Sequence, residues 1–346
     1  MKQSACDNND TKNKERESVG NYVLSDVADA AMDRLATVVH RTPIMRSETT
    51  NKLVGKHVYF KMENQQKTGA FKFRGASFKL TQLSNEQLKK GVIAASAGNH
   101  AQGVANAASK LNVRATIFMP EKTPVAKINA TRAYGADVVL TGESFQEAYE
   151  ASLKRQMQTG AEYIHPFDDY DVMAGQGTIA TEMLQQEDRI DTILVPVGGG
   201  GLISGIATAA KQKNPHIKVI GVQAAGASAM YTSYCHRQVA RLDKVSTIAE
   251  GIAVKKPGER TLPLIRRYVD DIMTVSDEEI AAATVYMLER NKTLLEGAGA
   301  TPLAALFAHN SKIKSDHCGM VMSGGNMDIS TLPMIQQLAS KHHHSA

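Results

Sequence analysis

Short apolar runs alternate with segments of helical spacing through most of this sequence. One series begins with VIAAS at residues 92–96 and continues through RATIFMP, ADVVLT and AEYIHP. A second series begins after Asp191 with TILVPV and continues through KVIGVQ, DDIMTV and MVM. Such alternation is typical of α/β units built on a mainly parallel sheet. The pattern therefore predicts an α/β fold of two lobes, each with a mainly parallel twisted sheet flanked by helices.

Turn and capping residues mark the ends of several predicted helices. Pro124 stands where a first helical turn tolerates it, and Gly135 is placed to end that helix. Ser276 and Glu279 form a capping box that opens a helix through Glu289. Parallel strands followed by glycine-rich turns place a ligand at the carboxyl ends of the strands. We therefore expect the functional site between the lobes, with residues 91–166 in the smaller one.

Composition excludes several classes of protein. The 346 residues carry a formal net charge of +5, lack tryptophan and show no basic stripe with interleaved aromatics, so we expect no nucleic-acid partner. Three scattered cysteines, Cys6, Cys235 and Cys318, make neither a disulfide framework nor a metal-binding pair, which favours a reducing, cytoplasmic setting. No stretch approaches the roughly twenty apolar residues of a membrane span. Residues 1–20 have no apolar core, so we expect neither a signal peptide nor an anchor there.

Four consecutive glycines, Gly198, Gly199, Gly200 and Gly201, stand between a predicted strand and a predicted helix. Glycines let the backbone approach an anion closely, and the free amides of a helix start point at it. A phosphate group is the natural ligand, although a flexible turn would also contain such a run. The Lys-Ser/Thr pair of a P-loop is missing, which disfavours a nucleoside triphosphate.

Lys72 lies in TGAFKFRGA, flanked by Phe71 and Phe73. Burial among such residues lowers the pKa of an amine and makes it nucleophilic toward an aldehyde. Taken alone, Lys72 would be interpreted as a surface lysine. Combined with a phosphate-binding turn, it supplies the minimum that pyridoxal phosphate requires, because that cofactor needs a Schiff-base lysine and an anchor for its phosphate.

Two further turns follow predicted strands. The turn Ser96-Ala97-Gly98-Asn99-His100 opens a helix, where amides and short polar side chains can hold a carboxylate. The second turn, Ser323-Gly324-Gly325-Asn326, ends the last predicted strand. An ordinary N-cap at Asn99 and an ordinary tight turn after residue 322 are the structural alternatives.

These elements, in this order, resemble the fold-type II pyridoxal-phosphate enzymes, and within them the threonine dehydratases of the short catabolic type. The resemblance covers about residues 18–332 and rests on FKMENQQKTGAFKFRGA, AASAGNHAQGVA, HPFDDYDVMAGQGTIA, VPVGGGGLISGIA, TIAEGIAV, LLEGAGA and SGGN. It implies a large cofactor-binding domain at residues 21–75 and 169–335 and a small domain at 76–168. The polar composition of residues 1–20 and 336–346 predicts a tail at each end. The resemblance also implies a homodimer or homotetramer that converts L-threonine, and L-serine, to a 2-oxo acid and ammonia.

The resemblance implies a role for each site residue. Lys72 forms the Schiff base and acts as the base, and Gly198, Gly199, Gly200 and Gly201 bind the cofactor phosphate. Asn99 contacts the 3'-hydroxyl of the ring, Ser323 faces the ring nitrogen, and Phe71 and Gly251 line the two ring faces. The substrate carboxylate is assigned to the turn formed by Ser96, Ala97, Gly98, Asn99 and His100.

Several departures bear on rival functions in the same family. Serine racemases resemble this chain but carry a serine where Ala97 stands, and a methyl group cannot move a proton. Their metal-binding acidic pair corresponds to Gln223 and Ala229 here, so we expect no metal site. Glu250 stands where an aspartate is more usual. About twenty residues follow SGGN, so we expect no isoleucine-sensing module.

Two other functions remain as alternatives to threonine dehydration. Within the family, 3-hydroxyaspartate dehydration is one of them. A non-catalytic cofactor carrier is the alternative from another class, and its signature would be loss of Lys72 or of the glycine run, both of which are present.

Overall fold

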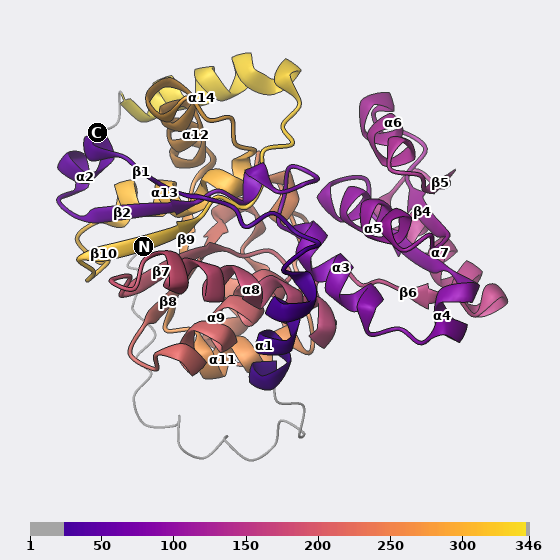
Figure 1. Cartoon of the computed structure of the whole chain (residues 1–346). Coiled ribbons are helices and arrows are strands. Elements are labelled where there is room, and N and C mark those ends of the chain that lie inside the picture. The colour runs from indigo at the N-terminus through magenta and orange to yellow at the C-terminus, as the bar shows by residue number, and fades with distance from the viewer. Residues whose placement is uncertain (1–23, 344–346) are drawn as a thin grey trace.

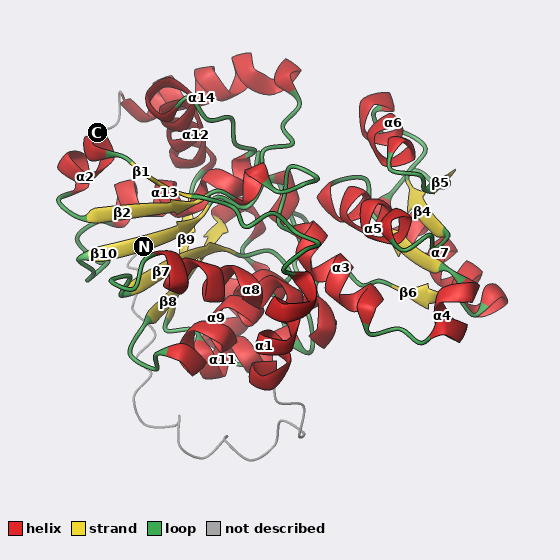
Figure 2. Ribbon diagram, viewed as in Figure 1, coloured by secondary structure: helices red, strands yellow, loops and turns green. Residues whose placement is uncertain are grey.

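The computed structural model describes residues 24–343, which form two separate sheets with helices packed around them (Figures 1 and 2). The larger sheet has six strands in the order β1-β2-β10-β7-β8-β9, and the smaller has four in the order β5-β4-β3-β6. Only β1 pairs in the antiparallel sense within these sheets; the other neighbours are parallel. This arrangement confirms the predicted fold class.

The strands are short, and most are apolar. Those of the larger sheet are β1 (Ile44–Arg46), β2 (His57–Lys61), β7 (Thr192–Pro196), β8 (Lys218–Ala224), β9 (Asp271–Val275) and β10 (His317–Val321). Those of the smaller sheet are β3 (Val92–Ala95), β4 (Ala115–Met119), β5 (Asp137–Leu140) and β6 (Glu162–Tyr163). The chain thus leaves the larger sheet after β2, builds the smaller sheet, and returns for β7.

Helices connect the parallel strands. The helices α4 (Asn85–Lys90), α5 (Asn99–Lys110), α6 (Val125–Ala133) and α7 (Phe145–Thr159) accompany the smaller sheet (Figure 1). The other α-helices are α1 (Leu24–Leu35), α2 (Glu48–Val54), α3 (Lys72–Thr81), α8 (Tyr170–Gln186), α9 (Gly201–Lys213), α10 (Ala229–His236), α11 (Thr261–Tyr268), α12 (Asp277–Asn291), α13 (Gly297–His309) and α14 (Leu332–His343). Four short 3-10 turns complete the fold: η1 (Glu63–Gln65), η2 (Ala225–Ala227), η3 (Glu250–Ile252) and η4 (Ile329–Thr331).

Both faces of the larger sheet are covered by apolar clusters. Along β7, Ile193 and Val195 belong to the cluster that includes Ile203 of α9, whereas Leu194 belongs to the opposite cluster with Leu303 of α13. Successive residues of a strand point to opposite faces. Every residue of β7 is buried, so this strand is covered on both sides, as expected for a parallel sheet.

Helices α3 and α8 cross closely where the chain passes between the two sheets (Figure 1). A Cβ atom on Gly175 would lie 2.7 Å from Cα of Gly75, and one on Gly75 would lie 2.6 Å from the carbonyl oxygen of Val172. Neither distance is compatible with a side chain. The two glycines therefore set how near α3, which begins at Lys72, comes to α8.

A buried ion network ties the same helices to strand β2. Arg74 Nε lies 2.8 Å from Glu63 Oε2, and its Nη1 lies 2.7 Å from Glu182 Oε1. Lys61 Nζ lies 2.6 Å from Glu182 Oε2. The side chains of Lys61, Glu63 and Arg74 are fully buried, so their charges are balanced inside the protein rather than by water.

The predicted tail at residues 336–346 is wrong for most of its length. Helix α14 continues to His343, and its buried residues Ile335 and Ala339 pack against Ala281 of α12. The polar composition concealed an apolar stripe at helical spacing, which stabilises the helix once α12 is beside it. The predicted tail at residues 1–20 lies outside the described residues. Among the described helices, none is long and apolar enough to cross a membrane.

Candidate active site

The glycine loop (residues 198–201) joins strand β7 to helix α9. Within the part of the chain that the structure describes, the backbone amides of residues 198–203 donate no hydrogen bond; the first bond of α9 runs from Ser204 N to the carbonyl oxygen of Gly200. Free amides at a helix start carry partial positive charge and bind anions. The loop therefore presents a row of donors suited to a phosphate.

Packing around the glycine loop explains its composition. A Cβ atom on Gly199 would lie 2.5 Å from the ring of Phe167, and one on Gly201 would lie 2.7 Å from Cα of Phe167. Gly200 has a φ of 99°, a left-handed conformation that favours glycine. The carbonyl oxygen of Gly199 accepts hydrogen bonds from Gly258 N and Thr261 Oγ1, which fix the loop from the other side.

Lys72 is the first residue of helix α3, and its side chain lies beside the same Phe167 segment. Lys72 Nζ donates to the carbonyl oxygen of Pro166 at 2.6 Å and lies 5.1 Å from the centre of the Phe71 ring. Burial lowers the pKa of the Lys72 amine to about 8, and the charge of Glu296 opposes this shift. About a tenth of the amine is therefore uncharged and nucleophilic at pH 7, far more than for an ordinary lysine.

The turn at residues 96–100 ends strand β3 and opens helix α5. Gly98 N donates to Ser96 Oγ, while the amides of Asn99 and His100 donate to no other group within residues 24–343. A Cβ atom on Gly98 would meet nothing within 4 Å. The turn around Ala97 therefore offers both open space and backbone amides without a partner, which suits a small anionic group.

The side chain of His100 turns away from this space. Its Nε2 lies 2.8 Å from the carbonyl oxygen of Ile164, and burial, with the charge of Lys72, lowers its pKa to about 3. The ring is therefore neutral and serves packing. Any contribution of His100 to an anion site would come from its backbone amide.

The remaining predicted residues surround Lys72. Phe71 N donates to the carbonyl oxygen of Ser323 at 3.1 Å, which places the Ser323 turn directly beside helix α3. The Ser323 side chain is buried, and its hydroxyl makes no hydrogen bond to a described residue. Gly251 lies in η3, and the next residue, Ile252, contacts Gly198 of the glycine loop. The structure thus brings together the residues that the sequence motifs single out.

Two titratable groups near Lys72 were missed by the sequence reasoning. Glu296 Oε1 accepts a hydrogen bond from Asn99 Nδ2 at 2.8 Å, and burial raises the pKa of this carboxyl to about 7. Burial lowers the pKa of His165 to about 4, and its Nδ1 accepts hydrogen bonds from the backbone amides of Phe167 and Asp168. Glu296 lies in LLEGAGA and His165 in HPFDD, two of the motifs that carry the family resemblance, and that position was the only sign of a role in the sequence.

Two residues that depart from the motifs of the family, Gln223 and Glu250, have partners in the structure. Gln223 is fully buried and accepts a hydrogen bond from Tyr231 N. Glu250 forms an ion pair with Lys127 of α6, with its Oε2 3.0 Å from Lys127 Nζ. Among the described residues, no group of three or more His, Cys, Asp or Glu side chains could hold a metal ion.

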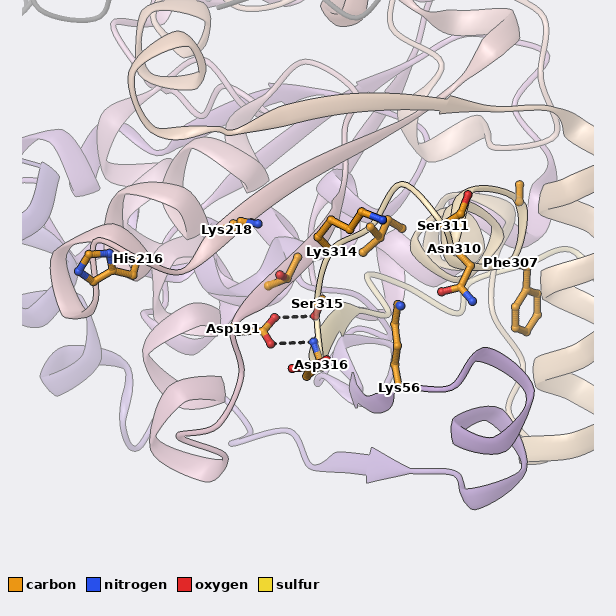
Figure 3. A pocket seen from close by; sticks show the side chains of 13 residues that line it. Lys56, Asp191, His216, Lys218, Phe307, Asn310, Ser311, Lys314, Ser315 and Asp316 are labelled. Atoms are coloured by element: carbon orange, nitrogen blue, oxygen red, sulfur yellow. Dashed lines mark hydrogen bonds between the residues drawn. The ribbon is translucent and has the colours of Figure 1, made fainter. Parts of the chain in front are cut away.

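A separate pocket lies at the amino ends of the strands of the larger sheet, away from the glycine loop (Figure 3). It is lined by residues at the amino ends of strands, including Thr192 of β7 and Lys218 of β8, and by Asp191, whose carboxylate accepts a hydrogen bond from Ser315 Oγ. Ligands of α/β sheets bind at the carboxyl ends of the strands. The residues around Lys72 stand at those ends, so this pocket is not the reaction site.

Together, the fold and the site define an α/β protein that holds a lysine amine beside a row of free amides. A family model described as pyridoxal-phosphate dependent enzyme matches residues 35–324, and the chain belongs to this family.

Curated and solved relatives agree with this assignment. The L-threonine ammonia-lyase of Geobacter sulfurreducens is 51% identical over 314 residues, which are 91% of this chain and 77% of the relative. The processed form of threonine deaminase isoform 2 from Solanum lycopersicum is 40% identical with a TM-score of 0.89, covering 92% of this chain and 88% of the other. Maize serine racemase is 38% identical with a TM-score of 0.86, covering 92% and 98%.

The described residues fit the cofactor of this family. Pyridoxal phosphate needs an amine for its aldehyde, donors for its phosphate and polar contacts for its ring. Lys72 offers an amine with a lowered pKa, and the glycine loop offers unoccupied amides. Ser323, buried beside the start of helix α3, offers a hydroxyl as a polar contact for the ring.

Proposed function

We propose that this chain is an L-threonine ammonia-lyase that produces 2-oxobutanoate and ammonia, and that it also converts L-serine to pyruvate and ammonia. The observation that carries this proposal is the position of the Lys72 amine, held beside the Phe167 segment that packs on the glycine loop. Threonine is supported as substrate by the 51% identity to an L-threonine ammonia-lyase.

Lys72 has two tasks in this proposal. When bound, pyridoxal phosphate supplies an aldehyde that condenses with amines and a ring that withdraws electrons from the substrate Cα. Lys72 tethers the cofactor through its amine and, once released by the incoming substrate, takes the Cα proton as general base. Its pKa of about 8 suits this exchange of a proton near neutral pH.

The surrounding residues bind and orient. The amides of residues 198–203, which donate no hydrogen bond within the described residues, would hold the phosphate. Asn99 would donate to the 3' oxygen of the ring, and Phe71 and Gly251 would line its two faces. Ser323 offers a neutral hydroxyl to the ring nitrogen, and a hydroxyl does not stabilise a protonated nitrogen as a carboxylate would. Electron withdrawal is therefore moderate, which favours prompt loss of the β-hydroxyl.

The turn at residues 96–100 is assigned to the substrate carboxylate. Its free amides and the space beside Gly98 support this assignment. The substrate is then held between this turn and Lys72.

Serine racemization is the second candidate, favoured by the similarity to maize serine racemase. It requires an acid or base on the ring face opposite the lysine. Ala97 stands where racemases of this family carry a serine, so racemization fits this chain less well.

The proposal extends to the setting of the enzyme. We place it in the cytoplasm as a homodimer or homotetramer; the small number of cysteines, with Cys318 a free buried thiol, supports a reducing compartment. Sedimentation equilibrium of the cofactor-loaded protein tests the assembly, and a monomer at micromolar concentration would contradict it.

Absorption spectra and product assays test the function. The purified protein with pyridoxal phosphate should gain a visible band, and addition of L-threonine should release a 2-oxo acid and ammonia in equal amounts. A band without turnover would indicate a cofactor carrier. D-Serine formed from L-serine faster than pyruvate would indicate a racemase.

A further inference from the structure

A chain of hydrogen bonds fixes the side-chain amide of Asn99 from both sides. Asn326 Nδ2 donates to the carbonyl oxygen of Thr68 at 2.7 Å and to Asn99 Oδ1 at 2.8 Å. Asn99 Nδ2 in turn donates to Glu296 Oε1 at 2.8 Å. The chain thus runs from Thr68 through Asn326 and Asn99 to Glu296.

The carbonyl oxygen of Thr68 determines which atoms donate and which accept in this series of hydrogen bonds. A backbone carbonyl can only accept a hydrogen bond, so the Asn326 atom that faces Thr68 must be Nδ2. Both hydrogens of Nδ2 are then used, one on Thr68 and one on Asn99. The Asn99 atom that faces Asn326 must therefore be the acceptor Oδ1, which leaves Asn99 Nδ2 facing Glu296.

Glycines make room for Asn326 and Glu296, the residues on either side of Asn99 in this series of hydrogen bonds. Gly69 has a φ of 72°, and a Cβ atom on it would lie 2.4 Å from Asn326 Oδ1. A Cβ atom on Gly324 would lie 2.6 Å from Glu296 Oε1, and one on Gly251 would lie 3.2 Å from it. The Glu296 carboxyl is thus set between two turns that also border the Lys72 site.

We propose that Glu296 and Asn326 are positioning residues that hold the Asn99 amide in one of its two orientations and aim the second Nδ2 hydrogen at the ring oxygen of the cofactor. This inference rests on the proposed function, because it takes the ring contact of Asn99 from it. Neither residue contacts the reacting atoms in this proposal. Each acts through Asn99.

The need for two flanking residues is physical. An asparagine amide presents a donor or an acceptor to the same point after a half turn, and only the donor stabilises an anionic ring oxygen. Glu296 can accept from Asn99 in either protonation state, because one carboxyl oxygen always keeps an acceptor site. Its raised pKa near 7 therefore does not interrupt the chain.

Matched variants of Glu296 separate positioning from packing. Glu296→Met keeps a similar volume and removes the acceptor, whereas Glu296→Gln keeps an acceptor oxygen. We expect Glu296→Met to weaken pyridoxal phosphate binding by the apoprotein about tenfold, the weight of one charge-assisted hydrogen bond. Glu296→Gln should stay within about twofold of the original chain. Equal affinities of the Met variant and the original chain would overturn the inference.

Asn326→Asp provides a second test on an exposed residue, where folding is not at risk. Its carboxylate would face two acceptors, the Thr68 carbonyl and Asn99 Oδ1, so Asn99 should rotate and withdraw its donor from the ring oxygen. At saturating cofactor, the visible absorption band, which reports an anionic ring oxygen, should lose intensity to the near-ultraviolet band. An unchanged ratio of the two bands would contradict the inference.

The Asn99→Ala background supplies the final control. If Asn326 acts through Asn99, Asn326→Asp should not change the band ratio further in that background, and an additive change would refute the chain. Borohydride labelling of Lys72 distinguishes failure of the positioning roles from failure of the proposed function. A labelled Lys72 with unaffected band ratios overturns only the positioning roles, whereas an unlabelled Lys72 in the original chain overturns the proposed function itself.

Discussion

Lys72 Nζ donates to the carbonyl oxygen of Pro166 at 2.6 Å, and the next residue, Phe167, lies against Gly199 and Gly201. One dipeptide between β6 and α8 therefore connects the amine to the glycine loop. Asp168, which follows, accepts hydrogen bonds from the amides of Glu259 and Arg260 and so fastens this segment to the start of α11. The Lys72 amine and the free amides of the glycine loop are thus held in one unit.

Replacement of the amine tests the first role of Lys72. The Lys72→Ala variant should lose threonine turnover by at least about a thousandfold, because it lacks both the tether and the general base. It should still bind pyridoxal phosphate reversibly, since the amides of residues 198–203 remain. Equilibrium dialysis measures the binding, and a 2-oxo acid assay measures the turnover. Turnover at the original rate would remove Lys72 from the mechanism.

The lowered pKa of Lys72 gives cofactor uptake a defined pH dependence. Only the uncharged amine condenses with an aldehyde, so the uncharged fraction rises with pH until it levels above the pKa of about 8. Stopped-flow absorption of apoprotein mixed with cofactor should show a rate that rises about tenfold per pH unit below that value and then levels. A rate that keeps rising beyond pH 9.5 or so would indicate an ordinary exposed lysine.

Two glycine substitutions should have different effects. In Gly199→Ala the new methyl group would lie 2.5 Å from the Phe167 ring, so the loop must shift and cofactor affinity should fall by tenfold or more, about 1.4 kcal/mol. In Gly98→Ala the methyl group enters open space at the turn assigned to the substrate carboxylate. There the KM for threonine should rise while cofactor affinity is retained. If Gly98→Ala instead lowered cofactor affinity and Gly199→Ala raised only the KM, the phosphate would be assigned to the turn at residues 96–100 and the substrate carboxylate to the glycine loop.

Ala97→Ser tests the distinction from the racemases. A hydroxyl at this position could return a proton to the second face of the substrate, so the variant should form D-serine from L-serine where the original chain forms only pyruvate. Chiral chromatography of the products measures the ratio. No detectable D-serine would mean that a single hydroxyl is insufficient for reprotonation.

The buried ion network should contribute strongly to stability. Glu63→Gln leaves the fully buried Arg74 with one of its two carboxylates, which should lower the free energy of unfolding by about 3 kcal/mol. Glu259→Gln, in an exposed pair with Lys256, is the matched control and should leave the free energy of unfolding nearly unchanged. Urea unfolding of both apoproteins makes the comparison. Similar losses in the two variants would show that the network adds no more than a surface pair.

Much of the fold was predictable because local signals and tertiary packing agree. The mainly apolar run of β7 before the glycines favoured a buried strand with a tight exit, and the capping box at Ser276 and Glu279 opens α12 as predicted. The glycine loop and Lys72 were found for the same reason, since their chemistry requires particular residue types. Their roles toward the cofactor remain predictions that the experiments above address.

The residues that escaped prediction depend on contacts between distant segments. Glu296 is one glutamate among many until Asn99, almost two hundred residues away, donates to it. Arg74 would be expected on a surface until Glu63 and Glu182 enclose it. Helix α14 looks polar until its apolar side meets α12. Composition and spacing within one segment do not contain these relations.

The crossing of α3 and α8 leaves little freedom to alter this enzyme at a distance from its chemistry. Gly75 and Gly175 meet with only hydrogen atoms between their backbones, three positions beyond the reactive lysine. A single methyl group at either glycine would push α3 away from α8 and move Lys72 relative to the glycine loop. The position of Lys72 is therefore as sensitive to the contact between Gly75 and Gly175 as to any polar group in the site.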